Sequence, residues 1–437
     1  MPRASFSIIG RNTLLDQASK TTTAFVIHPD IKSNRDRRDP EAALAEAASL
    51  AAALPGLVVK GSEVVRLAKV HPGMLFGSGK IEELKARFKA DEIELVLVDG
   101  PVGPVQQRNL EKEWGVKLLD RTGLILEIFA DRARTREGVL QVEMAALSYQ
   151  RTRLVRSWTH LERQRGGFGF VGGPGETQIE ADRRAIDDQL VKLRRQLDRV
   201  GRTRTLHRAA RAKVPFPIVA LVGYTNAGKS TIFNRLTGAE VLAKDMLFAT
   251  LDPTLRRVRL PSGLDVILSD TVGFISDLPT ELVAAFRATL EEVLDADLIL
   301  HIRDISHPQT DEQAHDVEAI LQSLGIKEET PLVEVWNKID LLDPEQRAAV
   351  HVQGERVPAV FPVSALTGEG LDALLAEVGH RLDEPRIEED LVVPFAAGRQ
   401  RAWLHENRVV VEEREEERGT RMRLRWTERQ RTRFQTL

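Results

Sequence analysis

The chain has 437 residues, of which 42% are hydrophobic and 29% charged, and its formal net charge is −3. This length exceeds what one hydrophobic core covers and predicts about three domains of an ordinary globular protein. No apolar run reaches the roughly 18 to 20 residues of a membrane span, and the N-terminus lacks the apolar core of a signal peptide, so we expect a cytoplasmic protein without a membrane span. Because cysteine is absent, disulfides, thiolate metal sites and cysteine nucleophiles are excluded.

Residues 1–20 are polar without periodicity, and we interpret them as a flexible tail. From residue 21 the pattern is that of alternating strands and helices. Strands are expected at residues 21–28, 56–67 and 93–99, and helices at 40–54, 79–90 and 104–114. Such alternation predicts a small parallel sheet, and residues 21–130 are therefore assigned to an N-terminal α/β subdomain.

A turn within this subdomain partly resembles a phosphate-binding loop. Gly77, Ser78, Gly79 and Lys80 open a helix, but Met74 stands where such a loop needs its first glycine. The residue after Lys80 is an isoleucine, which lacks the hydroxyl that would ligate magnesium. An ordinary helix N-terminus is the favoured interpretation, and a second anion or nucleotide contact, such as a secondary ATP site, is the alternative.

Residues 131–213 predict an antiparallel helical hairpin. Apolar residues recur at coiled-coil spacing in two seams, the first at Leu147, Leu154, Trp158 and Leu161, the second at Ile179, Ile186, Leu190, Leu193, Leu197 and Val200. Between the seams, residues 166–175 include six glycines and no charged residue. Glycine at this density is incompatible with a helix interior and marks the tip of the hairpin.

The hairpin is strongly basic. Nineteen Lys and Arg against ten Asp and Glu give residues 131–213 a net charge of +9, which leaves −12 for the rest of the chain. A solvated helix face is the usual reason for such a run, but seventeen of the nineteen are arginine, which favours nucleic acid. The candidate RNA contacts are Gly166, Gly167, Phe168, Gly169, Phe170, Arg183 and Arg184. The two phenylalanines could stack on unpaired bases or pack against each other.

A complete phosphate-binding loop follows the apolar run at residues 218–222. It consists of Gly223, Tyr224, Thr225, Asn226, Ala227, Gly228, Lys229 and Ser230, with Thr231 next in the helix. A strand, a glycine loop and a helix in this order point free backbone N–H groups at a phosphate. We expect Lys229 to reach the β- and γ-phosphates and Ser230 to ligate Mg²⁺, which predicts a nucleoside triphosphate site.

Two further segments are expected to meet at the γ-phosphate. The first consists of Phe248, Ala249, Thr250, Leu251 and Asp252, and the second, after a strand at 265–269, of Asp270, Thr271, Val272 and Gly273. Thr250 is placed to supply a second magnesium ligand, and Asp270 to hold the magnesium through water. The Gly273 amide would sense the γ-phosphate. The candidate catalytic residues are therefore Lys229, Thr250 and Gly273.

Two more segments predict a guanine-specific pocket. They follow strands at 332–336 and 357–363 and consist of Asn337, Lys338, Ile339 and Asp340, then Ser364, Ala365 and Leu366. The Asp340 carboxylate would accept from N1–H and the amine of guanine, which adenine does not offer. Leaving a charged group without its partner costs more than about 1 to 3 kcal/mol, so GTP should be preferred to ATP. A Ras-like P-loop G domain is expected over residues 214–384.

The residue after Gly273 departs from the Ras-like pattern. Phe274 stands where a Ras-type enzyme carries the glutamine that orients the attacking water. Unassisted hydrolysis should then be near or below ~10⁻⁴ s⁻¹, and a partner or an ion must supply the missing group. Asn226 makes K⁺ a candidate ion, since P-loop GTPases with asparagine at this position often bind potassium beside the phosphates.

Residues 385–437 have charge-rich turns between short apolar segments. Strands are expected at 391–395, 408–411 and 422–426, which indicates a small C-terminal α+β domain and nothing about its role. The expected fold class is thus a multidomain α/β protein with an N-terminal parallel α/β subdomain, an antiparallel helical hairpin, a Ras-like G domain and this small tail domain.

From residue 21 to about 381 the chain resembles the HflX family of ribosome-associated GTPases. The specific segments are GSGKIEEL at 77–84, ADRARTREGVLQVEMAAL at 130–147 and GPGETQIEADRR at 173–184. Gly172 stands where many members have an arginine. The resemblance implies GTP and GDP as ligands, and a helical subdomain that enters the large ribosomal subunit near the peptidyl transferase centre. It also implies that the GTP state splits stalled or idle ribosomes under stress. Separately, we expect a cytoplasmic monomer, ribosome-associated or peripherally at the membrane.

Two alternatives come from other classes of protein. An RNA-modifying or RNA-remodelling enzyme would need acid–base or cofactor residues outside the G domain, and the sequence offers no such group. A passive RNA-binding protein would use its nucleotide only for stability and would bind ribosomes equally with GDP and with a GTP analogue. The complete switch motifs argue against it.

Overall fold

The computed structural model describes residues 21–33, 38–164, 174–211, 216–239, 247–248, 250–251, 254–276, 292–326, 330–382, 386–407, 409–416 and 419–435. For residues 154–164, 174–179, 201–211, 386, 428–429 and 432–433 it describes the backbone only. None of the helices in these ranges is both long and apolar enough to cross a membrane.

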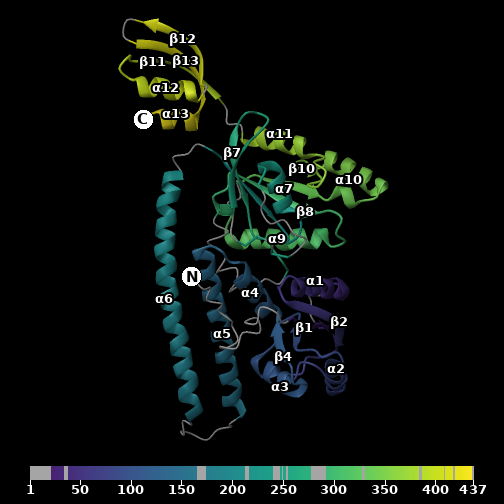
Figure 1. Cartoon of the computed structure of the whole chain (residues 1–437). Helices are drawn as coiled ribbons and strands as arrows, with labels where there is room; N and C mark the ends of the chain where they lie inside the picture. Colours follow the sequence, from purple (N-terminus) through teal and green to yellow (C-terminus); the bar gives the residue numbers. More distant parts are fainter. Residues whose placement is uncertain are drawn as a thin grey trace.

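The N-terminal sheet has four parallel strands in the order β2-β1-β3-β4 (Figure 1). The strands are β1 (Thr22–Ile31), β2 (Leu57–Leu67), β3 (Leu95–Val98) and β4 (Lys117–Asp120), and the helices between them are α1 (Pro40–Ala52), α2 (Ser78–Ala90) and α3 (Pro104–Trp114). The expected parallel sheet and its six expected elements are confirmed. Successive residues of β1 face opposite sides, so Phe25 packs under α2 and α3, whereas Val26 packs under α1.

Strand β4 and the helix α4 (Arg121–Arg132) that follows it were not expected from the sequence. Asp120 caps α4 by accepting a hydrogen bond from the Gly123 N–H at 2.8 Å. The helix buries nearly its whole circumference, because one side packs on the N-terminal sheet and another on the G domain.

The expected hairpin is present as α5 (Arg136–Gln164) and α6 (Pro174–Arg211), which lie side by side and antiparallel (Figure 1). Leu190 and Leu193 of the second seam are buried. The predicted tip contacts Gly166, Gly167, Phe168, Gly169 and Phe170 lie outside the described residues.

The G domain contains a six-stranded sheet in the order β10-β9-β8-β5-β7-β6, in which β6 alone runs antiparallel to its neighbour. Its strands are β5 (Ile218–Gly223), β6 (Thr254–Arg259), β7 (Asp265–Asp270), β8 (Leu298–Asp304), β9 (Leu332–Asn337) and β10 (Val360–Pro362). Its helices are α7 (Lys229–Thr237), α9 (Thr310–Leu324), α10 (Pro344–Arg356), α11 (Leu371–Leu382) and the short 3₁₀ helix η1 (Ile339–Leu341). The carboxyl ends of the parallel strands bring the predicted nucleotide loops to one edge.

One apolar cluster is shared by the N-terminal and G domains. Helices α7 and α11 cover one face of the G-domain sheet, and α9 covers the other, which faces the N-terminal domain (Figure 1). On that second face the cluster extends from α9 through Phe248 and Phe274 to α4. The two domains therefore share a packed interface directly under the predicted switch segments.

The C-terminal domain is an antiparallel sheet in the order β11-β13-β12 with two helices. Its elements are β11 (Arg386–Val393), α12 (Gly398–Glu406), β12 (Val410–Glu416), β13 (Gly419–Thr427) and α13 (Glu428–Gln435). Trp403, Met422, Trp426 and Phe434 form its small core. Three strands are present as expected, but their bounds differ, since β11 ends at Val393 and β12 extends to Glu416. The two helices were not expected, since each contributes only one or two apolar residues to that core.

Candidate nucleotide-binding site

The phosphate-binding loop requires glycine at both ends. Gly223 closes β5 with φ +154°, and a Cβ there would lie 2.2 Å from the Ile302 carbonyl oxygen of β8. Gly228 precedes α7 with φ +97°, and a Cβ there would lie 2.1 Å from the Asn337 amide nitrogen. The loop thus approaches two neighbouring segments so closely that no side chain fits.

The Lys229 ammonium lies inside the loop. Its Nζ donates to the carbonyl oxygens of Gly223 at 3.0 Å and Tyr224 at 2.8 Å. Burial lowers the pKa of Lys229 to about 8, and the charge of Asp270 only partly opposes this shift. A bound phosphate would supply the negative charge that the buried ammonium needs.

Gly273 packs directly against the phosphate-binding loop. A Cβ at Gly273 would lie 2.8 Å from Thr225 Cα and 3.0 Å from Lys229 Nζ. Phe274, the next residue, pairs with the loop through its backbone, since its N–H donates to the Gly223 carbonyl and its carbonyl accepts from the Thr225 N–H. The Phe274 ring is buried in the apolar cluster. It therefore lies away from the phosphate position and offers no polar group to water there.

Three oxygen-bearing side chains converge beside Lys229. The Ser230 hydroxyl lies 2.9 Å from the Thr250 hydroxyl, and both donate to Asp270 Oδ2, at 2.7 Å and 3.0 Å. Burial raises the pKa of the Asp270 carboxyl. Hydroxyl and carboxylate oxygens are the donors that Mg²⁺ prefers, so this set fits the ion that the sequence implied.

Asn337 connects the phosphate-binding loop to the predicted base pocket. Its amide donates to the Ala227 carbonyl at 2.8 Å and accepts from the Ala365 N–H at 2.9 Å. Ser364 donates to Asp340 Oδ1 at 2.5 Å, which fixes the carboxylate and leaves its second oxygen available for a base. The three segments are thereby held as one unit.

The other predicted nucleotide residues have different surroundings. Lys338 adopts φ +69° and pairs with Asp304 at 2.7 Å, Leu366 is exposed, and Ile339 is fully buried. Thr271 donates to the Leu221 carbonyl. Phe248, Leu251 and Val272 are buried in the apolar cluster. Ala249 and Asp252 lie outside the described residues.

One residue at the site was missed by sequence reasoning. Arg235 of α7 donates to the carbonyl oxygens of Leu366 at 2.8 Å and Thr367 at 2.6 Å, and so supports the segment after Ala365. A basic residue in the last turn of a helix is ordinarily solvated, so no local pattern marks this contact.

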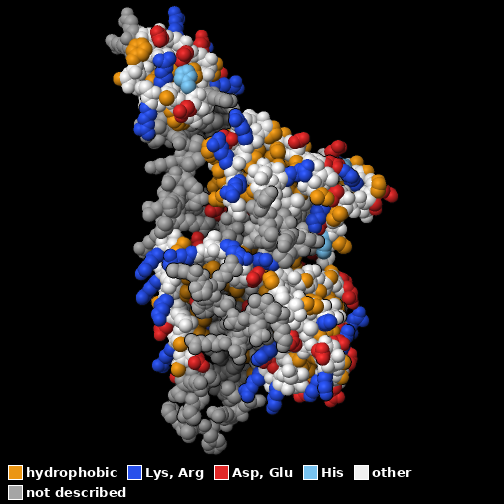
Figure 2. All heavy atoms as spheres, in the orientation of Figure 1, with side chains coloured by type: hydrophobic (Ala, Val, Ile, Leu, Met, Phe, Trp, Pro, Cys, Tyr) orange, Lys and Arg blue, Asp and Glu red, His pale blue; other side chains and the backbone are white. Residues whose placement is uncertain are grey.

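The basic surface of the hairpin is exposed on α6. Arg183 and Arg184 are exposed, and among the described side chains they form long i,i+4 pairs of 4.0 Å with Asp187 and Glu180. Figure 2 shows further Lys and Arg side chains along the outer edge of this helix. Among the side chains of α6 that the structure describes, the exposed basic ones are Arg183, Arg184, Lys192, Arg194, Arg195 and Arg199.

Four family models cover most of the chain. They are described as GTP-binding GTPase N-terminal at residues 41–130, GTP-binding GTPase Middle Region at 132–211, 50S ribosome-binding GTPase at 218–338 and HflX C-terminal domain at 349–436. The last match extends the resemblance beyond residue 381, where the sequence analysis had ended it, and includes the C-terminal domain.

Curated relatives match over similar spans. GTPase HflX of Magnetococcus marinus is 52% identical over 362 residues, covering 83% of both chains. GTPase HflX of Escherichia coli is 45% identical over 350 residues, covering 80% of this chain and 82% of the relative. Putative GTP-binding protein 6 of Xenopus laevis is 36% identical and covers 81% of this chain and 67% of its own length. The chain therefore belongs to the HflX family of GTPases.

Proposed function

We propose that this GTPase binds the large ribosomal subunit through the α5–α6 hairpin and, in its GTP state, separates stalled or idle ribosomes into subunits. The observation that supports the proposal is the exposed row of basic residues on α6. The same chain contains both predicted switch segments, so RNA binding could depend on the nucleotide state. Arginine in such density suits ribosomal RNA phosphates. GTP hydrolysis would then weaken binding and release the factor, which we expect to work as a monomer in the cytoplasm.

Roles for individual residues follow from the site. Lys229 would hold the β- and γ-phosphates, Gly273 would donate its N–H to the γ-phosphate, and Asp340 would select guanine. Ser230 and Thr250 would ligate Mg²⁺ and Asp270 would hold it through water, and the ion would stabilise charge on the phosphates. Since Phe274 offers no group to orient water, we expect the large subunit to complete the site. K⁺ beside Asn226 is the second candidate, and equal hydrolysis rates in potassium and sodium buffers would remove it.

The first test compares nucleotide states on intact ribosomes. Ribosomes are mixed with the protein and either a nonhydrolysable GTP analogue or GDP, and subunits are separated on a sucrose gradient. We expect free subunits with the analogue and intact ribosomes with GDP. Intact ribosomes with both nucleotides would contradict splitting, whereas equal binding with both would favour a passive RNA-binding protein.

The second test addresses the hairpin. Charge reversal of both Arg183 and Arg184 to Glu should weaken binding to large subunits and reduce the slope of log K against log salt by roughly 2, one unit per lost phosphate contact. The matched control is reversal of Arg421 and Arg423 on the C-terminal sheet, where both residues pair with carboxylates. Unchanged binding in the hairpin variant would place the contact elsewhere.

A further inference from the structure

Helix α4 of the N-terminal domain contacts both segments that surround the γ-phosphate position. At its first residue, Arg121 Nη2 donates to the Ser276 carbonyl oxygen at 2.8 Å, three residues after Gly273. Two turns later, the Phe129 ring packs edge-on against Phe248, with ring centroids 4.6 Å apart, two residues before Thr250. One rigid helix thus spans the two switch segments.

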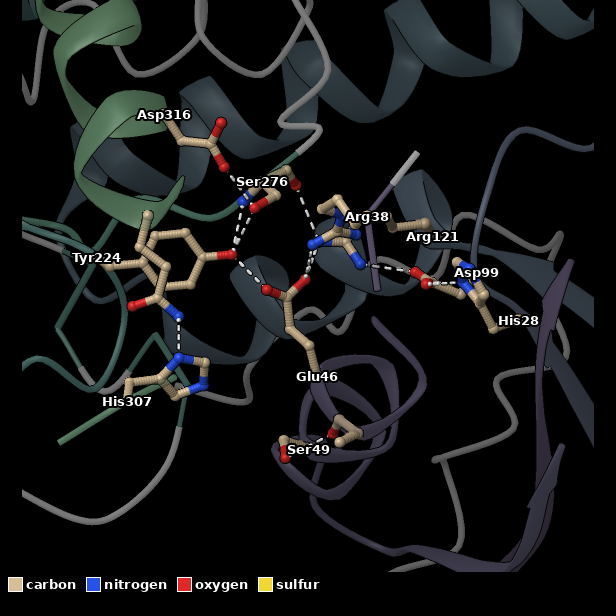
Figure 3. Close-up of polar contacts among 12 residues, drawn as sticks. His28, Arg38, Glu46, Ser49, Asp99, Arg121, Tyr224, Ser276, His307 and Asp316 are labelled. Atoms are coloured by element: carbon tan, nitrogen blue, oxygen red, sulfur yellow. Dashed lines mark hydrogen bonds and ion pairs between the residues drawn. The ribbon is translucent and has the colours of Figure 1, made fainter. Parts of the chain in front are cut away.

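The Arg121 guanidinium is held in place from within the N-terminal domain (Figure 3). It donates to Asp99 Oδ1 at 2.6 Å and to the Glu46 carboxylate, and His28 Nδ1 lies 2.8 Å from the second Asp99 oxygen. Burial opposes the charge of Arg121, but the two carboxylates outweigh burial and raise its pKa. Arg121 is therefore a fixed, permanently charged donor to the Ser276 carbonyl.

The same group of residues reaches the phosphate-binding loop. The Tyr224 hydroxyl donates to Glu46, lies 2.8 Å from the Ser276 hydroxyl and accepts from the Ser276 N–H at 2.9 Å. Ser276 in turn donates to Asp316 of α9 at 2.5 Å. The backbone N–H, the carbonyl and the side chain of Ser276 are each held, as Figure 3 shows. The segment that begins at Gly273 therefore cannot shift without breaking contacts to the N-terminal domain.

We call closed the arrangement in which the Thr250 hydroxyl lies beside Ser230 and Asp270, and the α4 contacts occur together with it. Phe248 is buried against Phe129 with φ +56°, while the Thr250 hydroxyl lies beside Ser230 and Asp270. In GTPases the γ-phosphate and its metal order these segments, and hydrolysis releases them. The α4 contacts thus belong to the arrangement that accepts GTP.

We propose that α4 is a positioning element for GTP: Arg121 and Phe129 hold the segments of Gly273 and Thr250 where the γ-phosphate binds. A contact made only in the closed arrangement adds to the affinity for GTP and not to the affinity for GDP. By linkage, GTP must strengthen the docking of α4 on the G domain by the same factor. The N-terminal domain would then report the nucleotide state to the hairpin that follows it.

The test measures the affinities of a GTP analogue and of GDP for the free full-length protein. Arg121→Lys keeps the charge but loses the fork that serves Asp99, Glu46 and Ser276 together, and Phe129→Leu removes the ring. Each variant should bind the analogue roughly 10-fold more weakly and GDP within about 2-fold of the parent. The matched control is Arg87→Lys, because the described contacts of Arg87, to Glu63, Asp91 and the Phe25 ring, lie within the N-terminal domain and away from α4.

Equal losses for both nucleotides would overturn the proposal and leave Arg121 and Phe129 a purely structural role. A second measurement needs no variant: amide hydrogen exchange in α4 should slow with the GTP analogue relative to GDP. Identical exchange in the two states would also overturn the proposal. Both measurements are made without ribosomes, so they do not depend on the proposed splitting activity.

Discussion

Two Gly-Lys turns open helices in this chain, one at residues 77–80 and the other at residues 223–230. Their lysines differ in what they contact. Lys80 of the N-terminal domain pairs with Glu63 of β2 and, at 2.6 Å, with Glu83 of its own helix. Lys229 of the G domain contacts backbone carbonyls and lies in a buried loop that lowers its pKa to about 8. A phosphate could replace the backbone carbonyls around Lys229, whereas at Lys80 it would have to displace two carboxylates.

The largest expected effect is on nucleotide binding, which should depend on Lys229 and not on Lys80. Lys229→Met should weaken binding of a GTP analogue by at least about 100-fold, because it removes charged hydrogen bonds to two phosphates. Lys80→Met should leave GTP and ATP binding unchanged. Fluorescent-nucleotide titration of both variants measures the difference. A comparable loss of ATP binding in Lys80→Met would show that the first turn is a second nucleotide site.

The turns also show what a sequence can and cannot predict. The phosphate-binding loop was recognisable because the residues expected to contact the phosphates lie within eight consecutive positions. Arg121 and Ser276, by contrast, meet across 155 positions, and nothing near either residue marks the contact. Helices α2 and α3, each with one buried apolar face, were predicted, whereas α4, which packs between two domains, was missed. The residues of the domain interface are thus those that local patterns describe least well.

A smaller effect, on stability, follows from His301, which is buried in the G-domain sheet. His301 of β8 is 1% exposed, and its Nδ1 has no hydrogen-bond partner within the described part of the chain. Burial lowers the pKa of His301 to about 4, with a contribution from the charges of Arg303 and Lys229 that Glu334 opposes. At pH values between about 4 and 6.5, the His301 side chain is therefore protonated in the unfolded chain but neutral in the folded protein.

Stability should therefore fall as the pH falls through this window. The His301 contribution to the loss is about 2 kcal/mol between pH 7 and pH 5. Urea unfolding of the parent and of His301→Asn at both pH values measures it, since the variant should lose that much less on acidification. Equal losses in both proteins would mean that His301 titrates normally in the folded state.

The smallest expected effect concerns Glu63 and Glu83, and tests whether these two carboxylates alone prevent the turn at Lys80 from binding a phosphate. Replacing Glu63 and Glu83 by Gln together frees Lys80, and because these ion pairs are partly exposed, the free energy of unfolding should fall by only about 1 kcal/mol or less. We expect no ATP binding to appear, since Met74 and Ile81 still stand where a phosphate-binding loop needs a glycine and a hydroxyl.

That experiment is made in the Lys229→Met background, so that the G domain contributes little nucleotide binding of its own. Equilibrium dialysis against labelled ATP then reports on the first turn. Micromolar ATP binding after the double replacement would mean that two carboxylates mask a working phosphate site. No ATP binding after the replacement would mean that a free lysine is not sufficient and that the glycine-containing backbone of a phosphate-binding loop is also required. The close contacts of Gly223 and Gly228 in the G domain already indicate that requirement.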